Sequence, residues 1–290
     1  PPPPPPPPPP PTTSLPQTPR PQLFPYTTLF LSEFCIDALG YTLSASVFVY
    51  AGSDTVVLIN AATGVPRQFY KYFATYLRDH GWTTLTYDYR GIGGSAPASL
   101  RGLDFRMRDW AQIDMPALID WICAELRPRR LFSIGHSFGG QGIGLIEDPQ
   151  RITAMVGVSA QSGYWGVQGG AERYRARFAV TVLIPALTRL FGYFPWSRFA
   201  AGEDLPAGVA LEWARWCRDR DYLLGDETLP LERYTAFDAP ILAYSIDDDD
   251  WGTSRAVDDM MRAYSNVTRR HLVPADYGLD KVGHMGFFRQ

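Results

Sequence analysis

Short apolar runs alternate with segments of helical periodicity from Ser32 onward. The helical pattern fits residues 68–80, 107–126 and 255–264, where apolar residues recur every three or four positions. Strands are expected within FCIDALGYTLSASVFVYAG (two runs around Gly40), TVVLINA, WTTLTYDY, RLFSIG, ITAMVGVSA, PILAYSI and VTRRHLV. Strands and helices that alternate in this way predict an α/β protein with a mostly parallel sheet and helices on both faces.

One long segment, between Gly163 and about Phe237, interrupts the alternation. It contains no clear strand and is rich in aromatic residues. We interpret residues 163–237 as a helical cap insertion over the carboxyl edge of the sheet, where open α/β sheets bind their ligands. Most of its aromatic side chains are expected to form its own core, and about a quarter to line a pocket.

Charge, cysteine content and hydropathy argue against several classes of function. A net charge of -3, with Lys and Arg scattered along the chain, argues against a nucleic-acid partner. Three widely spaced cysteines without a CxxC pair argue against a disulfide framework and a zinc site. No apolar run is as long as a membrane span and no signal-peptide pattern is present, so we expect a cytoplasmic protein without a membrane span.

The first residues have no pattern that would bury them against a core. The chain opens with eleven Pro, and a Pro-rich stretch continues to about Leu31. We expect residues 1–31 to be a disordered tail. Because PYTTLF is similar to a translated sequencing adapter, two interpretations stay open: an assembly artefact or an ordinary Pro-rich tail.

A serine stands between glycines in FSIGHSFGGQGIGL, where an apolar run ends and a helical pattern begins. Residues 135–139 fit G-x-S-x-G, with a strand before the motif and a Gly-rich helix start after it. A turn this sharp strains the middle residue and leaves no room for flanking side chains, which favours glycine there. We therefore expect Ser137 to be a nucleophile, with the Phe138 amide at the helix N-terminus stabilising the oxyanion.

A serine nucleophile needs a base and an acid, and the chain has four histidines. His80 ends a predicted helix, His136 adjoins the serine and should pack elsewhere, and His271 lies inside a predicted strand. His284 is the predicted base, because it follows the last strand in a Gly-flanked loop that can reach the carboxyl edge. AYSIDDDDWGT places four Asp after a strand at the same edge, and one of them would orient the imidazole.

The order Ser, Asp, His and the motifs DYRGIGGS, GHSFGGQ and VGHMGFFR resemble those of the α/β-hydrolase superfamily. Within it, the chain is most similar to a group of predicted bacterial serine hydrolases of the serine aminopeptidase and esterase type, over residues 33–289. The resemblance implies the α/β-hydrolase fold. Aligning Thr253 with the Pro of a G-E-D-D-x-x-x-P pattern implies Asp249 as the triad acid, with Asp248 as the near alternative.

The resemblance also implies a second oxyanion amide in the loop INAATGVPRQFY. Asn60-Ala61 stands where relatives commonly have His-Gly, so the amide would be that of Ala62, with Thr63 second. Relatives continue beyond the His284 loop into a helix that packs on the sheet, whereas this sequence ends six residues after His284. The expected consequence is a looser loop and weak activity.

These residues together predict a serine hydrolase that cleaves an ester, thioester or small amide through an acyl-enzyme intermediate. Ser137, Asp249 and His284 would form the triad, and the amides of Ala62 and Phe138 the oxyanion hole. The aromatic insertion favours an apolar small-molecule acyl substrate, and no metal or organic cofactor is implied. The alternatives are an acyltransferase or cofactor-free peroxidase on the same fold, and a relative that binds a ligand without turnover.

Overall fold

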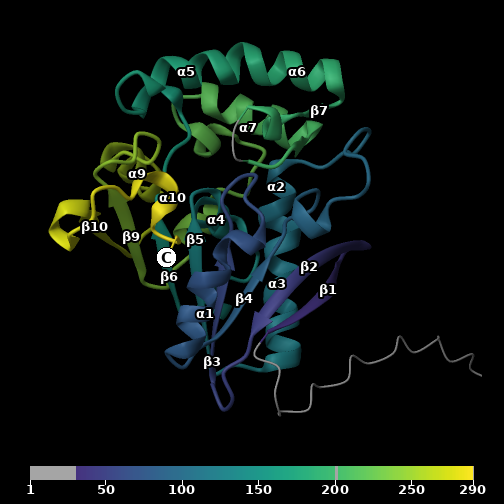
Figure 1. The fold of residues 1–290 in the computed structure, drawn as a ribbon, viewed down its shortest axis with the longest axis vertical. Coiled ribbons are helices and arrows are strands. Elements are labelled where there is room, and N and C mark those ends of the chain that lie inside the picture. Colours follow the sequence, from purple (N-terminus) through teal and green to yellow (C-terminus); the bar gives the residue numbers. More distant parts are fainter. Residues whose placement is uncertain (1–30, 200–201, 290) are drawn as a thin grey trace, which may run out of the picture.

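An eight-stranded sheet forms the body of the protein in the computed structural model, which describes residues 31–199 and 202–289 (Figure 1). The strand order is β1-β2-β4-β3-β5-β6-β9-β10. Only β2 runs antiparallel to its neighbours, so the predicted mostly parallel sheet is confirmed. The strands are β1 Ser32–Ala38, β2 Tyr41–Phe48, β3 Thr55–Asn60, β4 Thr83–Tyr87, β5 Arg130–His136, β6 Ala154–Val158, β9 Ile241–Ile246 and β10 Val267–Leu272. The expected tail at 1–31 lies, except for Leu31, outside the described residues.

Helices cover both faces of this sheet (Figure 1). The predicted helix at 68–80 is a 3-10 turn followed by α1, and the one at 107–126 consists of α2 and α3 with two π turns. The helices of the body are α1 Lys71–Asp79, α2 Met107–Asp109, α3 Met115–Trp121, α4 Phe138–Gly142, α8 Glu232–Thr235, α9 Ser254–Met261 and α10 Gly283–Gly286. Every residue of β3 and β4 is buried, so the core is centred on these two neighbouring strands.

Most of the expected cap at 163–237 lies over one end of the sheet in two layers (Figure 1), whereas α8 near its end packs against the body. The outer layer is one continuous helix made of α5 Glu172–Phe178, a π turn at Ala179–Leu183 and α6 Ile184–Phe191. Beneath it, α7 Ala207–Arg218 packs against α6. The expectation of no strand is wrong, because β7 Tyr193–Phe194 pairs with β8 Leu205–Pro206. Two residues per strand are too few to produce an alternating pattern in the sequence.

A cluster of charged side chains joins this cap to the body. Arg108 of α2 contacts Glu212 of α7 at 2.7 Å and Asp226 at 2.9 Å. Burial alone would raise the pKa of Asp226, but hydrogen bonds from Thr228, Trp216 and Arg215 outweigh burial and hold that pKa well below its usual range. Both acids are almost fully buried, so the cap depends on ion pairs largely shielded from water.

Candidate active site

Ser137 occupies a strained turn between β5 and α4. Its φ of 49° and ψ of -118° lie outside the regions that ordinary residues favour. The glycines around it allow this turn, because a Cβ on Gly139 would lie 2.1 Å from the carbonyl oxygen of Asn60, and one on Gly135 would lie 2.3 Å from the Cα of Gly140. The sharp turn expected from the sequence is therefore present, and Phe138 begins the helix that follows.

Asp249 and His284 are brought together at the carboxyl edge of the sheet. The Nδ1 of His284 lies 2.8 Å from Oδ2 of Asp249, which also accepts a hydrogen bond from the Ser159 hydroxyl at 2.7 Å. The amides of Trp251 and Gly252 donate to Oδ1 at 3.0 and 2.7 Å. Burial would raise the pKa of Asp249, but the charge of His284 and these hydrogen bonds outweigh burial and lower the pKa to about 2.

The neighbouring Asp248 binds the main chain of the same loop. Its two carboxylate oxygens accept hydrogen bonds from the amides of Val282 and Gly283, at 2.9 and 2.8 Å. Asp248 therefore holds the segment that carries His284, while Asp249 faces the imidazole. The four acids alone did not separate these two tasks, and the choice of Asp249 rested on the resemblance to the G-E-D-D-x-x-x-P pattern.

A buried hydrogen-bonded chain that the sequence did not reveal runs behind Ser137 and His284. The Ala62 amide donates to the hydroxyl of Tyr70 at 2.9 Å, and that hydroxyl donates to Nδ1 of His136 at 2.8 Å. The Nε2 of His136 donates to the carbonyl of His284 at 2.8 Å. Burial, and then the charge of His284, lower the pKa of His136 to about 3, so its ring is neutral. His136 thus packs behind the site and joins the nucleophile turn to the base loop.

The Ala62 amide, predicted to bind the oxyanion, already has an acceptor in this structure. An oxyanion at that amide would have to compete with the Tyr70 hydroxyl. Thr63, the second candidate, lines the same cavity as Ala62. The other two histidines lie elsewhere: Nδ1 of His80 contacts the Tyr76 carbonyl, and His271 contacts Ser245 and Asp247.

A cavity of about 760 Å³ is lined by both Ser137 and His284. Within residues 31–199 and 202–289, no hydrogen bond joins Oγ of Ser137 to Nε2 of His284. Hydrogen bonds between catalytic groups are often long without substrate and shorten once it binds. The structure therefore brings the predicted nucleophile and base to one cavity, with the acid behind the base.

The cap supplies most of the apolar wall of this cavity. Side chains from the inner face of the outer helix and from around α7 line it: Ala176, Ala179, Val180, Leu183, Ile184, Phe194, Trp196, Trp213 and Tyr222. Polar groups are few. Gln141, itself a lining residue, accepts from the hydroxyl of Tyr222 and donates to the carbonyl of Gln161. The buried side-chain oxygen of Gln161 has no hydrogen-bond partner within the described part of the chain.

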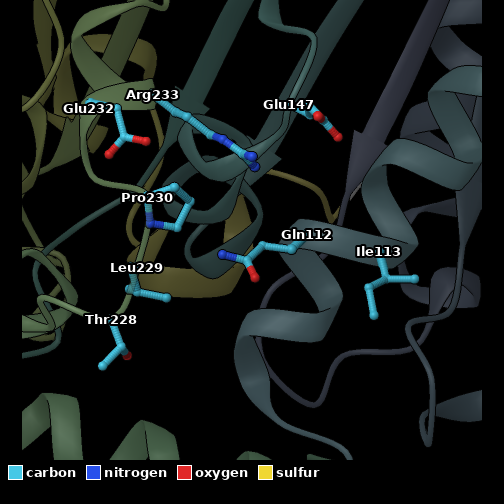
Figure 2. A pocket seen from close by; sticks show the side chains of 8 residues that line it. All are labelled: Gln112, Ile113, Glu147, Thr228, Leu229, Pro230, Glu232 and Arg233. Carbon is cyan, nitrogen blue, oxygen red and sulfur yellow. The ribbon is translucent and has the colours of Figure 1, made fainter.

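A second hollow, of about 620 Å³, has a different character (Figure 2). Its eight lining residues include charged Glu147, Glu232 and Arg233 but no serine, histidine or cysteine. Arg233 donates a hydrogen bond to the carbonyl of Leu145. This hollow brings no serine and histidine together, so the cavity at Ser137 is the candidate active site.

Two general features of the described residues bear on function. No three His, Cys, Asp or Glu side chains among them are arranged to hold a metal ion. Across those same residues, no helix is both long and apolar enough to span a bilayer.

Similarity to known proteins agrees with this architecture. No curated protein matches the chain by sequence. Among solved structures, Est1E from Butyrivibrio proteoclasticus, determined with ferulic acid bound, has a TM-score of 0.55 at 16% identity, over 87% of this chain and 91% of that one. The Pyrococcus furiosus esterase Pf2001 has a TM-score of 0.54 at 16% identity, over 89% and 86%. XC6422 from Xanthomonas campestris, described as an α/β serine hydrolase without lid, has a TM-score of 0.51 at 15% identity, over 91% and 89%.

These likenesses concern the fold. The model of the α/β hydrolase fold family matches residues 54–198, half of the chain, including the strand and turn that carry Ser137. The strand order, the single antiparallel strand and the nucleophile turn agree with that match. The chain therefore belongs to the α/β hydrolase fold family.

Proposed function

We propose that the chain is a serine hydrolase of the carboxylic-ester hydrolase type, which cleaves an ester, thioester or small amide through an acyl-enzyme intermediate. The observation that carries this proposal is the buried Asp249–His284 hydrogen bond at the edge of a cavity that Ser137 also lines. A binding protein would have no need of a buried carboxylate aligned behind an imidazole beside a strained serine.

The proposed reaction uses each side chain in turn. Because Nδ1 of His284 donates a hydrogen bond to Asp249, Nε2 is available as the base. Nε2 takes the proton of Ser137 as its Oγ attacks the carbonyl carbon, and Asp249 stabilises the imidazolium that forms. His284 then gives the proton to the leaving group. In the second half, His284 takes a proton from the water that attacks the acyl carbon, and it returns that proton to Oγ of Ser137 as the acyl group leaves.

The oxyanion would be held by main-chain amides. The Phe138 amide is the first of α4, where helical amides lack an acceptor in the preceding turn. The second donor is Ala62, if its amide leaves the Tyr70 hydroxyl for the oxyanion, or Thr63. Either residue fits, because the donor is a main-chain N–H.

The cavity favours an acyl group that is mostly apolar. Aliphatic and aromatic cap side chains form the wall facing Ser137. The unpartnered oxygen of Gln161 is available to accept a hydrogen bond from an N–H or O–H of the substrate, since a buried acceptor left unsatisfied costs free energy. We propose an acyl chain of several carbons that carries a hydrogen-bond donor for Gln161 or for Gln168, whose side-chain oxygen at this cavity is also buried without a partner among the described residues.

Labelling by a fluorophosphonate probe tests the activated serine. Wild type should label, Ser137→Ala should not label at all, and His284→Ala should label at least about a hundredfold more slowly, because an unassisted hydroxyl is a poor nucleophile. Ser133→Ala is the matched control, since this buried serine lies on the same strand with its hydroxyl bonded to Asn60. It should label like wild type, and peptide mapping should place the adduct on Ser137.

A folded wild type that resists the probe would contradict the proposal and favour the ligand-binding alternative. Equal labelling of wild type and Ser137→Ala would assign the reactive group to another residue. Products formed from a labelled acyl donor with water and with added alcohols then separate a hydrolase from an acyltransferase.

A further inference from the structure

The outer cap helix, Glu172–Phe191, is apolar on two opposite faces. Its inner face, with Val180 and Ile184 almost fully buried, lines the cavity. Its outer face carries four large apolar side chains that we call the outer stripe: Tyr174, Phe178, Val182 and Leu190, which are 59%, 57%, 49% and 73% exposed. Large apolar side chains gathered on one exposed helix face mark a candidate interaction surface.

The outer stripe has the spacing of a binding surface. Tyr174, Phe178 and Val182 are four residues apart, and exposed Ala186 and then Leu190 continue the series. Residues four apart on a helix lie next to one another, so these side chains form one row instead of scattered points. Because α5 and α6 are the elements farthest from the sheet, the row lies on an outer surface of the molecule (Figure 1).

Arginines border the outer stripe. Residues 171–199 contain five Arg and a single acid, Glu172, whereas the whole chain has a net charge of -3. The guanidinium of Arg173 lies 4.7 Å from the ring of Tyr174, and that of Arg177 lies 5.0 Å from the ring of Trp165. Arg175 pairs with Glu172 at 3.5 Å and lines the Ser137 cavity, so it does not belong to the border of the outer stripe. The outer helix and the segment that follows it are thus locally basic, whereas residues 163–237 as a whole carry as many acids as arginines.

The outer stripe and the neighbouring arginines together favour one kind of partner. A second copy of the chain on the outer stripe would bring two basic borders together, which like-charge repulsion disfavours. An anionic phospholipid bilayer complements both features: its phosphates attract arginine, and its headgroup region accepts apolar side chains from a helix that lies flat on it.

We propose that the outer cap helix docks on the surface of an anionic phospholipid bilayer, with the outer stripe in the headgroup region and the arginines at the phosphates. The same helix lines the cavity with its inner face, so docking holds the cavity next to the bilayer. The proposal does not depend on the proposed hydrolysis, because it concerns binding alone.

Cosedimentation of the full chain with phospholipid vesicles tests this proposal. Vesicles of equal amounts of phosphatidylcholine and phosphatidylglycerol should bind the protein, and phosphatidylcholine alone should bind it at least about tenfold more weakly. The double variant Phe178→Ser, Leu190→Ser should lose at least about tenfold in partitioning. The matched control is Tyr72→Ser, Tyr76→Ser, since these side chains of α1 are 68% and 55% exposed and lie outside the cap. It should partition like wild type.

Further experiments test the role of charge and the oligomeric state. Arg173→Gln, Arg189→Gln should weaken partitioning roughly tenfold and reduce its salt dependence, whereas Arg129→Gln, Arg130→Gln should leave both unchanged. Failure of the wild type to bind anionic vesicles, or equal loss in the Tyr72 and Tyr76 variant, would overturn the proposal. A dimer seen by analytical ultracentrifugation and dissolved by Phe178→Ser, Leu190→Ser would assign the stripe to a second copy and overturn it too.

Discussion

The carboxyl edge of the sheet and the cap above it are held by different kinds of contact. At the edge, Asp249 accepts hydrogen bonds from two main-chain amides, and the main-chain carbonyl of His284 accepts a hydrogen bond from the ring of His136. At the cap, one side chain, Arg108, joins Glu212 and Asp226 to the body. Main-chain bonds also reach the body from the cap, from the Glu203 amide to the Gly64 carbonyl and from the Gly169 amide to the Asp250 carbonyl. The edge is therefore fixed mainly by backbone groups, whereas the cap combines backbone bonds with a buried ion cluster.

This difference suggests how rigidity is divided between the two regions. Backbone contacts and close glycine approaches leave the nucleophile turn a single conformation. An ion cluster can open as a unit, and local opening of a cap is how a substrate would reach a cavity covered by it. Three changes test the division, beginning with the largest expected effect.

Gly139→Ala should distort the nucleophile turn and destabilise the fold. The new Cβ would meet the Asn60 carbonyl oxygen at 2.1 Å, so α4 would have to move away from β3. We expect a loss of about 4 kcal/mol in the free energy of unfolding, measured by urea denaturation. Gly157→Ala is the matched control, because its Cβ would meet neighbours at 3.4 Å, an ordinary contact, and should cost less than about 1 kcal/mol. Equal costs would argue against the special tightness of the turn.

Arg108→Met should break the cap's attachment. Removing the cation leaves Glu212 and Asp226 buried with fewer partners, which we expect to cost about 3 kcal/mol. Hydrogen exchange should accelerate in α7 while β5 stays protected. The control Arg151→Met removes ion pairs to Asp120 and Asp148 between exposed side chains, and should change stability by less than about 0.5 kcal/mol. Acceleration in β5 as well would mean that cap and body open together.

The pH dependence of stability sharpens the description of the edge. The folded-state pKa of Asp249, about 2, lies below its ordinary value of 3.8, so its ionised form stabilises the fold above that ordinary value. This contribution is lost as the pH falls from about 4 to about 2. The stability difference between wild type and Asp249→Asn should therefore shrink by about 2 kcal/mol between pH 5 and pH 2. A difference that stays constant over this range would show that the carboxylate is not held in its ionised form.

Much of the fold could be predicted from the sequence, because it depends on local patterns. The eight strands of the large sheet coincide with their expected runs to within two residues, and the glycines around Ser137 mark the turn. It was harder to predict which face of the helix at 68–80 is buried. Tyr72 and Tyr76 fall on the apolar-looking face yet are exposed, whereas Tyr70, in the 3-10 turn before α1, is buried. A 3-10 turn shifts the helical phase, and the sequence contains no signal for that shift.

The site was predictable to the level of residue types but not of partners. Asp248 and Asp249 are adjacent in the chain and chemically identical, and only the path of the loop decides which one meets His284. The bond from the Ala62 amide to Tyr70 is equally invisible, since it depends on how a 3-10 turn packs under the sheet edge. Contacts of this kind arise from tertiary structure, which single-residue patterns do not encode.

The contacts of the two adjacent aspartates imply a tolerance for sequence change. Four of their partners are main-chain amides, those of Trp251, Gly252, Val282 and Gly283. An amide is present whatever side chain a residue carries, except in proline. Substitutions other than proline at position 282 can therefore leave His284 on Asp249. Trp251 is constrained by its ring contact with His284, and Gly252 because a Cβ there would lie 2.5 Å from Oδ2 of Asp249.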